Sequence, residues 1–416
     1  MRRGIATAAP EALRNAGHIV LLLTKDDQHR AHNELEFPVI IGVPKEVKNN
    51  EFRVAITAAG VHEFLVHGHT VLVEAGAGVA SGISDADYLS AGATTISTAA
   101  EVWASVDMIL KVKEPVAVEY THFREGLILF AYLHLAAEPA LAAALVESGV
   151  TAIAYETVQK ADRSLPLLAP MSEVAGRLAV QVGAQSLTRP AGGPGILMGG
   201  VPGVRAAKVT VLGAGVAGTN AAAMALGMGA DVTILDININ RLRELDAHYA
   251  GRLKTVASNT FEIDRAVTEA DLVIGSVLIP GAKAPKLVSN ELVSRMQPGS
   301  VLVDIAVDQG GCFADSHATT HEDPTFPVHN SIFYCVANMP GAVPRTSTFA
   351  LTNVTLPYSL SIADRGVRAA FERDASLAAG LNIAAGRIAS RSVSTALGLE
   401  LSDWTDLITD AEPPLV

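Results

Sequence analysis

The stretch that decides the fold is Lys208-Val-Thr-Val-Leu-Gly213-Ala-Gly215-Val-Ala-Gly218, which is continued by Val232-Thr-Ile-Leu-Asp236. A β-branched apolar run stops at the first glycine of a Gly-x-Gly-x-x-Gly motif. The small residues that follow predict a helix over 219–229, and the second apolar run predicts a strand that ends in an acid. This order of strand, glycine turn, helix, strand and acid is the one that a dinucleotide-binding unit requires.

Each residue of the motif has a predicted task. Gly213 makes the tight turn, Gly215 lets the backbone approach a pyrophosphate, and Gly218 lets helix and strand pack closely. The free N–H groups at the helix start attract phosphate. Asp236 can accept hydrogen bonds from both ribose hydroxyls and would repel a 2′-phosphate, so the cofactor is expected to be NAD rather than NADP. The alternative reading is a glycine-rich turn that binds no ligand.

The composition indicates a well-packed protein of two domains. The chain has 416 residues, of which 49% are hydrophobic and 18% are charged. A net charge of −12 argues against a nucleic-acid partner, and no stretch predicts a membrane span. Only Cys312 and Cys335 are present, so we expect buried thiols in a reducing cytoplasm. No group of residues has the spacing of metal ligands, and no serine nucleophile elbow occurs.

The chain outside the motif alternates strand-like and helix-like segments. Residues 1–36 lack periodicity and are expected to be a mostly disordered extension, with at most a short strand at 18–24. Beyond it, the expected strands are 39–43, 70–74, 108–112, 127–132, 151–155, 270–276 and 300–305. The expected helices are 57–67, 139–148, 171–187 with Ser172 as its N-cap, 358–373 and 375–397. Alternation of this kind predicts parallel sheets with helices on both faces.

The fold class that follows is α/β with two doubly wound domains. A Rossmann NAD-binding domain at 167–344 is expected to be inserted into a discontinuous substrate domain formed by 37–166 and 345–416. The C-terminal helices are expected to pack back on the first domain.

Four polar residues stand where predicted strands end, which is where open α/β sheets place ligand groups. Arg53 could bind a small carboxylate, or it could lie on a solvated loop. A lysine of Lys111-Val-Lys113 could meet a substrate carbonyl or carboxylate, or pair with Glu114. The imidazole of His134 could shuttle protons, although a structural histidine is the simpler interpretation. The fourth residue, Asp308, precedes two glycines and could handle protons or cap a turn. Together these groups suit hydride transfer that is coupled to proton transfer.

With those residues in view, the chain from about residue 37 to near its end resembles the alanine dehydrogenases. The resemblance rests on motifs in matching order, from Gly42-Val-Pro-Lys-Glu and Asn49-Asn-Glu-Phe-Arg-Val-Ala through Leu110-Lys-Val-Lys-Glu-Pro and Leu133-His-Leu-Ala-Ala. It continues with Ala169-Pro-Met-Ser-Glu-Val-Ala-Gly-Arg, the glycine motif, Asp304-Ile-Ala-Val-Asp-Gln-Gly-Gly and Ala337-Asn-Met-Pro. The extension has no counterpart in the family.

This resemblance implies reversible, NAD-dependent conversion of L-alanine to pyruvate and ammonia by a homohexamer. It implies that Arg53 binds the substrate carboxylate, that Lys113 binds the substrate oxygen, and that His134 and Asp308 are the acid–base pair. The positions that it implies for the cofactor are Ser172, Gly213, Gly215, Gly218, Asp236, Arg241, Ser258, Val277, Leu278, Asn338 and Met339. The resemblance also points to a divalent ion near residues 358–365 in some relatives, but Ser361 and Arg365 are poor ligands, so no metal is expected here.

Two other interpretations compete with this one. The NAD-binding alpha component of a nicotinamide nucleotide transhydrogenase typically has Glu-Gln-Gly where this chain has Asp308-Gln-Gly, and it lacks the paired context of Lys113 and His134. A non-catalytic dinucleotide sensor would be expected to lack the proton-handling residues, which this chain retains. Both alternatives are therefore less favoured than a self-contained dehydrogenase.

Overall fold

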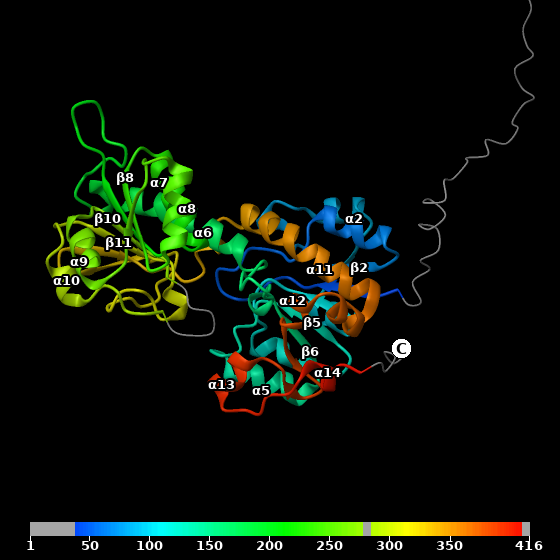
Figure 1. Cartoon of the computed structure of the whole chain (residues 1–416). Helices are drawn as coiled ribbons and strands as arrows, with labels where there is room; N and C mark the ends of the chain where they lie inside the picture. Colours follow the sequence, from blue (N-terminus) through cyan, green and yellow to red (C-terminus); the bar gives the residue numbers. More distant parts are fainter. Residues whose placement is uncertain (1–37, 278–283, 410–416) are drawn as a thin grey trace, which may run out of the picture. The chain divides into compact units, whose positions relative to one another are not determined.

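The computed structural model describes residues 38–277 and 284–409. These residues form two separate β-sheets, each covered by helices (Figure 1). The extension 1–36, with its expected short strand at 18–24, lies outside the described residues, as does Leu278.

The first sheet has eight strands in the order β15-β14-β6-β5-β4-β1-β2-β3. Their bounds are β1 Ile40–Val43, β2 Thr70–Glu74, β3 Thr94–Ile96, β4 Met108–Leu110, β5 Ile128–Ala131, β6 Thr151–Ala154, β14 Leu381–Ala384 and β15 Arg387–Ile388. The chain adds β2 and β3 on one side of β1, then β4, β5 and β6 on the other. The strand order therefore reverses between β1 and β4, where open α/β sheets form ligand crevices.

The second sheet repeats this plan with seven strands in the order β12-β13-β11-β10-β7-β8-β9. Their bounds are β7 Lys208–Leu212, β8 Asp231–Asp236, β9 Lys254–Ala257, β10 Leu272–Gly275, β11 Val301–Asp304, β12 Thr325–Val328 and β13 Ser331–Tyr334. Here the order reverses between β7 and β10, and only β12 runs antiparallel to its neighbour. Since β14 and β15 return after this sheet, the first sheet is discontinuous in the sequence.

Helices cover both faces of each sheet. Those around the first sheet are α2 Ala58–Val66, α3 Asp85–Ser90, α4 Ala99–Ala104, α5 Pro139–Ser148, α11 Pro344–Arg373, α12 Ala375–Ala378, α13 Arg391–Leu397 and α14 Trp404–Leu407. Those around the second are α6 Ala169–Ser186, α7 Val216–Gly227, α8 Ile239–Tyr249, α9 Thr260–Glu269 and α10 Asn290–Ser294.

Alternate residues of each strand enter two different cores. On β10, Leu272 and Ile274 pack with α6, α7 and α8, whereas Val273 packs with α9 and α10. On β4, Met108 and Ile109 likewise face opposite cores. Strands buried on both faces are continuous apolar runs, which is why the sequence predicted parallel sheets correctly.

Two expected helix starts were wrong by several residues. Helix α6 begins at Ala169 with Pro170 in its first turn, so Ser172 lies inside the helix and is not its N-cap. Helix α7 begins at Val216, within the glycine motif, because Gly215 is its N-cap. Pro is well accommodated in the first helical turn, where its missing N–H has no partner to lose.

The C-terminal region also differs from the prediction. The expected helix 358–373 is the second part of α11, which begins at Pro344 and is interrupted at Gly366 (φ 74°). The expected helix 375–397 is instead α12, the antiparallel strands β14 and β15, and α13. Ala385 and Gly386 both have positive φ, the geometry of a two-residue hairpin turn. Alanine is an unusual first residue for such a turn, so the turn could not be predicted from its residues.

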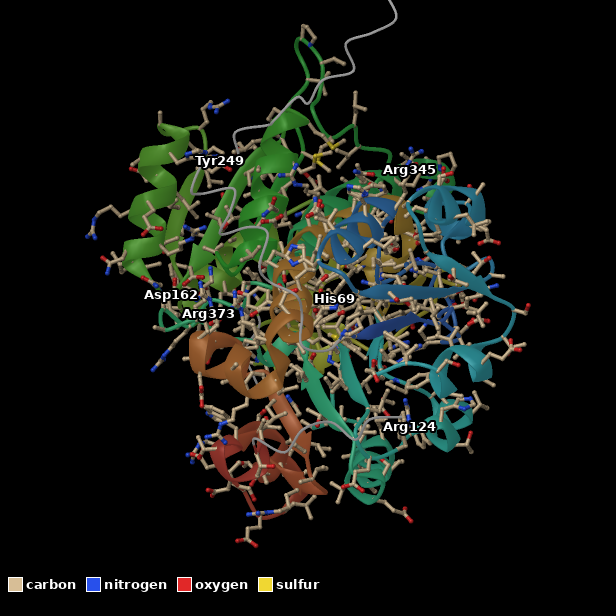
Figure 2. All side chains as sticks on the ribbon, turned by 90° about the vertical axis from the view of Figure 1, so that its right-hand side faces the viewer. His69, Arg124, Asp162, Tyr249, Arg345 and Arg373 are labelled. Atoms are coloured by element: carbon tan, nitrogen blue, oxygen red, sulfur yellow. The ribbon has the colours of Figure 1, made fainter. Side chains whose placement is uncertain are left out.

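Helix α11 packs against the first sheet, as expected for the C-terminal segment. It contacts α2, α12 and α6, and its Asp364 accepts hydrogen bonds from the rings of His67 and His69, at 3.0 Å each. His69 (labelled in Figure 2) also accepts the backbone N–H of Val39 at its other ring nitrogen. These bonds tie the beginning of β1 to α11.

Candidate active site

Three of the predicted residues gather at the carboxyl edge of the first sheet. Arg53 follows β1, Lys113 follows β4 and His134 follows β5, and these three strands are adjacent. The positive charges of Lys113 and Arg53 both lower the pKa of His134, so the three side chains lie within electrostatic reach of one another. The structure therefore brings them together at the point where the strand order reverses.

Arg53 is buried rather than solvated, with 2% of its surface exposed. Its Nε and Nη2 donate to the two carboxylate oxygens of Glu51, and Nη2 also donates to Asn338 Oδ1 at 2.9 Å. Nη1 lies 3.0 Å from the sulfur of Met171. Burial alone would raise the pKa of Glu51, but the hydrogen bonds and charge of Arg53 outweigh it and lower that pKa. The pair is thus fully ionised, and the guanidinium is held in a fixed orientation.

The two lysines after β4 have different surroundings. Lys111 is 1% exposed and its Nζ lies 3.1 Å from Glu46 and 2.9 Å from Glu119, so it belongs to a buried ion network. Glu46 also accepts the backbone N–H of Val112 at 2.6 Å, which fixes the segment that carries Lys113.

Lys113 is the lysine that faces the site. Its Nζ lies 3.9 Å from Glu114 Oε2, while Lys48 pairs with the other oxygen of the same carboxylate. Burial lowers the pKa of Lys113, the carboxylate of Asp308 opposes this, and the charges of Arg53 and Lys48 add to the lowering. The ion pair with Glu114 that the sequence offered as an alternative role is therefore present, but it is too long for a hydrogen bond.

His134 is held in an unusual backbone conformation by a half-buried acid, Glu156. Its φ is 49°, and its backbone N–H donates to Glu156 Oε1 at 2.6 Å. The ring stacks on Tyr132 and its side chain is 39% exposed. Desolvation by the surrounding protein, together with the positive charges of Lys113, Lys48 and Arg53, lowers the pKa of His134 to about 3. The imidazole is thus neutral at physiological pH, the protonation state that a general base must have.

The glycine motif has the geometry that its sequence predicted. Gly213 has φ 100°, which suits only glycine, and a Cβ on Gly218 would lie 1.9 Å from the carbonyl oxygen of Gly213. Gly215 is different, since its φ of −69° is open to any residue and a Cβ there would meet nothing within 4 Å. The first and third glycines serve the fold, whereas the second leaves open space at the start of α7. That space fits a pyrophosphate at a helix N-terminus.

The acid at the end of β8 faces the same turn. Asp236 accepts the backbone N–H of Ala214 at 2.6 Å and that of Asn238 at 2.7 Å. Arg241 donates to the carbonyl oxygen of Ala214, and Ser258 donates its N–H to the Asp236 carbonyl. The neighbouring Ile237 is 84% exposed, an apolar surface beside a carboxylate. Such a combination fits the adenine and ribose of a dinucleotide.

The remaining predicted residues lie along the carboxyl ends of the second sheet. Val277 follows β10, and Asp308 lies after β11 in the 3-10 turn Val307–Gln309, where it is exposed. Asn338 and Met339 follow β13, but Met339 is buried in the core and the Asn338 side chain turns to Glu51 and Arg53. Ser172 lies apart from this row, half-buried in the first turn of α6.

Several residues that shape the site had no assigned role in the sequence interpretation. Glu51, Glu156 and Glu46 each hold a predicted site residue or its segment through buried hydrogen bonds. Glu51 lies two residues before Arg53, and this short spacing is the one sequence signal that could have indicated the pair. Glu156 and Glu46 are distant in sequence from their partners, so no local pattern could reveal them.

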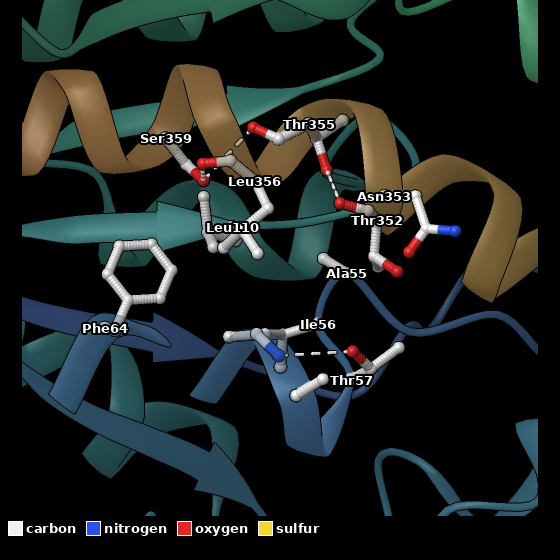
Figure 3. A pocket seen from close by; sticks show the side chains of 12 residues that line it. Ala55, Ile56, Thr57, Phe64, Leu110, Thr352, Asn353, Thr355, Leu356 and Ser359 are labelled. Carbon is white, nitrogen blue, oxygen red and sulfur yellow. Dashed lines mark hydrogen bonds between the residues drawn. The ribbon is translucent and has the colours of Figure 1, made fainter. Parts of the chain in front are cut away.

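One small hollow lies elsewhere, between α2 and α11 (Figure 3). It is lined by none of the predicted site residues, but by apolar residues together with Thr57, Thr352, Asn353, Thr355 and Ser359. Within residues 38–277 and 284–409, no cluster of His, Cys, Asp and Glu side chains is arranged to hold a metal ion. Over the same described ranges, every helix is too short or too polar to cross a membrane. Cys312 and Cys335 are both buried and unpaired, as expected.

Two family models match most of the chain. The N-terminal domain of alanine dehydrogenase/PNT matches residues 42–175, and the C-terminal domain of alanine dehydrogenase/PNT matches residues 179–391. Alanine dehydrogenase of Mycobacterium tuberculosis is 61% identical over 363 residues, which are 87% of this chain and 98% of that protein. Alanine dehydrogenase of Bacillus subtilis is 58% identical over 363 residues, which are 87% and 96%.

Solved structures agree with these matches. A structure of L-alanine dehydrogenase superposes with a TM-score of 0.84 at 51% identity, covering 86% of this chain and 99% of that one. A transhydrogenase from Sinorhizobium meliloti superposes with a TM-score of 0.73 at 28% identity, covering 85% and 99%. The chain therefore belongs to the alanine dehydrogenase/PNT family.

Proposed function

We infer that the protein is an NAD-dependent alanine dehydrogenase, which interconverts L-alanine and water with pyruvate and ammonia. The relatives that it matches over nearly their whole length are alanine dehydrogenases at 55–61% identity. The observation in the structure that carries this function is the convergence of Arg53, Lys113 and a neutral His134 at one sheet edge. A carboxylate receptor, an ammonium and a base are what oxidation of a small amino acid needs.

We propose a separate role for each residue of the site. Arg53 binds the substrate carboxylate, and Lys113 donates to the oxygen that becomes the keto group of pyruvate. His134 and Asp308 exchange protons with the substrate amine and with water. The second sheet, in a domain at 167–344, binds NAD through the glycine motif, Asp236, Arg241, Ser258 and the residues after β10, and the loop after β13 lies beside them. The flanking segments 37–166 and 345–416 form the substrate domain.

The reaction then proceeds at the substrate. Bound NAD would supply the hydride acceptor for Cα of alanine, and loss of hydride from the neutral amine would leave the substrate as an iminium ion. His134, neutral because of its lowered pKa, accepts a proton from the water that adds to this carbon. In the resulting carbinolamine, the nitrogen takes up a proton and leaves as ammonia, while the hydroxyl gives up a proton to form the keto group of pyruvate. His134 and Asp308 exchange these protons with the substrate. Lys113 donates to the oxygen on which negative charge develops; burial lowers its pKa, and the carboxylates of Asp308 and Glu51 oppose that lowering.

The two alternatives make different predictions. The solved transhydrogenase is related at 28% identity, well below the alanine dehydrogenases, so transhydrogenation is the less supported activity. A sensor would bind NAD without turnover. Both are tested by following NADH absorbance after purified protein is mixed with NAD and L-alanine at alkaline pH. Steady NADH formation supports the dehydrogenase, whereas good NAD binding with a flat trace would favour the sensor.

The assembly and location of the protein are also proposals. We propose a cytoplasmic homohexamer, as the family resemblance implies, and the two buried free thiols suit a reducing compartment. Light scattering after size-exclusion chromatography would test the assembly directly, since a hexamer and a monomer of 43.3 kDa differ sixfold in mass. A monomer or dimer that is fully active would contradict the proposal.

A further inference from the structure

The guanidinium of Arg53 is more restricted than substrate binding alone requires. A guanidinium has five N–H donors, arranged so that two edges can each grip a carboxylate with two bonds. The Nε and Nη2 edge is already bound to both oxygens of Glu51. The second hydrogen of Nη2 goes to Asn338 Oδ1 at 2.9 Å. Only Nη1 remains, and its contact is the thioether of Met171, a weak acceptor that a ligand can replace.

Asn338 closes this network from the other sheet. Its Nδ2 donates to Glu51 Oε2 at 2.9 Å while its Oδ1 accepts from Arg53, so one amide satisfies both members of the ion pair. The residue follows β13 and has φ 58°, a left-handed conformation that asparagine tolerates. Arg53 and Glu51 follow β1 in the first sheet, 285 and 287 residues away in sequence. The orientation of the arginine thus depends on a loop of the NAD-binding sheet.

We propose that Glu51 and Asn338 form a lock that positions Arg53, so that the arginine offers a substrate carboxylate its Nη1 edge alone. Asn338 is, on this view, a residue that positions Arg53 for the substrate, although the family resemblance implied a role for it in cofactor binding. The inference rests on the proposed function only in taking Arg53 as the carboxylate receptor. It adds that recognition of the carboxylate requires both sheets, because Arg53 follows a strand of the first sheet and Asn338, which fixes its orientation, follows a strand of the second.

The contact between Glu51 and Asn338 has a donor–acceptor direction that mutation can reverse. In Asn338→Asp, the new carboxylate faces Glu51 at hydrogen-bond distance and the two repel. In Glu51→Gln, the amide nitrogen faces an Arg53 donor at either oxygen position, and arginine cannot accept. In the double variant, the amide at position 51 donates to the carboxylate at position 338 and its oxygen still accepts from Arg53 Nε, while the bond from Nη2 to position 51 is lost. The net charge and the contact between positions 51 and 338 are then restored, and aspartate also tolerates the left-handed backbone.

The test measures KM for L-alanine, the NADH dissociation constant by fluorescence, and the thermal stabilisation that pyruvate gives to the NADH complex. Each single variant should raise KM about 10- to 100-fold, as expected for a charged hydrogen bond left unsatisfied. The double variant should have a lower KM than Asn338→Asp, because the repulsion between the two carboxylates is removed. Asn338→Gly, which removes the side chain without backbone strain, should raise KM about tenfold and change NADH affinity less than about twofold.

Glu51→Gln separates the lock from a simple effect of charge. Removing a negative charge near the substrate carboxylate should lower KM if charge alone matters, whereas the lock predicts an increase. A lower or unchanged KM in this variant overturns the proposal, as does a double variant no better than Asn338→Asp. A loss of NADH affinity in Asn338→Gly without a change in KM would make the side chain a cofactor ligand instead.

The failure of the lock can be told apart from the failure of the proposed function. If the wild-type protein does not oxidise L-alanine, the proposed function is overturned. The lock is then tested by the thermal stabilisation that pyruvate gives to the NADH complexes of the wild type and the same four variants. If pyruvate does not bind to the wild type either, both proposals are overturned. Thermal unfolding of each variant without ligand shows whether the fold is retained.

Discussion

Replacement of Lys111 by methionine should destabilise the protein far more than loss of an ordinary ion pair. The Lys111 ammonium is 1% exposed and lies 3.1 Å from Glu46 and 2.9 Å from Glu119, whose side chains are 3% and 7% exposed. Methionine fills a similar volume but leaves two carboxylates buried beside each other without a counter-charge. Breaking a buried pair in this way costs about 3–5 kcal/mol, and we expect the upper end because two acids are orphaned.

The loss should depend on pH in a defined direction. Burial raises the pKa of Glu46 above its usual value, and Lys111 opposes that rise. Without the lysine, the pKa of Glu46 in the folded state rises further above its unfolded value, so the folded protein takes up a proton more readily. The destabilisation is therefore largest above the raised pKa and shrinks as pH falls through it. Urea unfolding at pH 8 and at pH 5 should show the smaller loss at pH 5.

A matched control is available on the surface. Lys254 pairs with Asp231 at the edge of the second sheet, and the side chains are 59% and 43% exposed. Lys254→Met should cost less than about 1 kcal/mol at either pH. If Lys111→Met lost no more free energy of unfolding than Lys254→Met, the reasoning about the buried network would be refuted.

Three further predictions concern the site. Asp308→Asn should retain NAD binding but lose at least about 100-fold in turnover, which kcat and a fluorescence titration would measure; normal turnover contradicts its acid–base role. Gly218→Ala should weaken NAD binding and lower stability by about 1–3 kcal/mol, because its Cβ would lie 1.9 Å from the Gly213 carbonyl oxygen. Gly227→Ala, in the same helix with open space around the added Cβ, is its control and should be neutral or stabilising by up to about 1 kcal/mol. Finally, the pKa of His134 is lowered to about 3, so kcat/KM should not fall with an apparent pKa near 6.5 as the pH is lowered. A fall near 6.5 that is present in the wild type and absent in His134→Ala would contradict this.

The fold was largely predictable because its signals are local. Buried parallel strands are continuous apolar runs, and the glycine motif needs a particular backbone, so both sheets could be predicted. The segment 375–397 could not, because alanine-rich sequence favours helix while the hairpin turn depends on positive φ at Ala385 and Gly386. Tertiary pairing with β6 then overrides the local preference for helix.

The site was predictable only in part, for a related reason. Arg53, His134 and a lysine of the pair Lys111 and Lys113 could be named because ligand groups gather where strands end. The resemblance to the alanine dehydrogenases then selected Lys113. Their supporting acids could not, because each acts across the fold rather than along the chain. The clearest case is Asn338, whose contact with Glu51 spans 287 residues. Such a contact leaves no periodicity or spacing in the sequence, so its role became apparent only in the structure.

The central claim is that Cα of L-alanine gives its hydride to NAD at the edge shared by Arg53, Lys113 and His134. The most direct test is to incubate the protein with NAD and L-alanine deuterated at Cα, and to measure the mass of the NADH formed. The claim predicts that the NADH gains one deuterium and that one pyruvate appears for each NADH. Unlabelled NADH, or no NADH at all from a protein that binds NAD well, would contradict it.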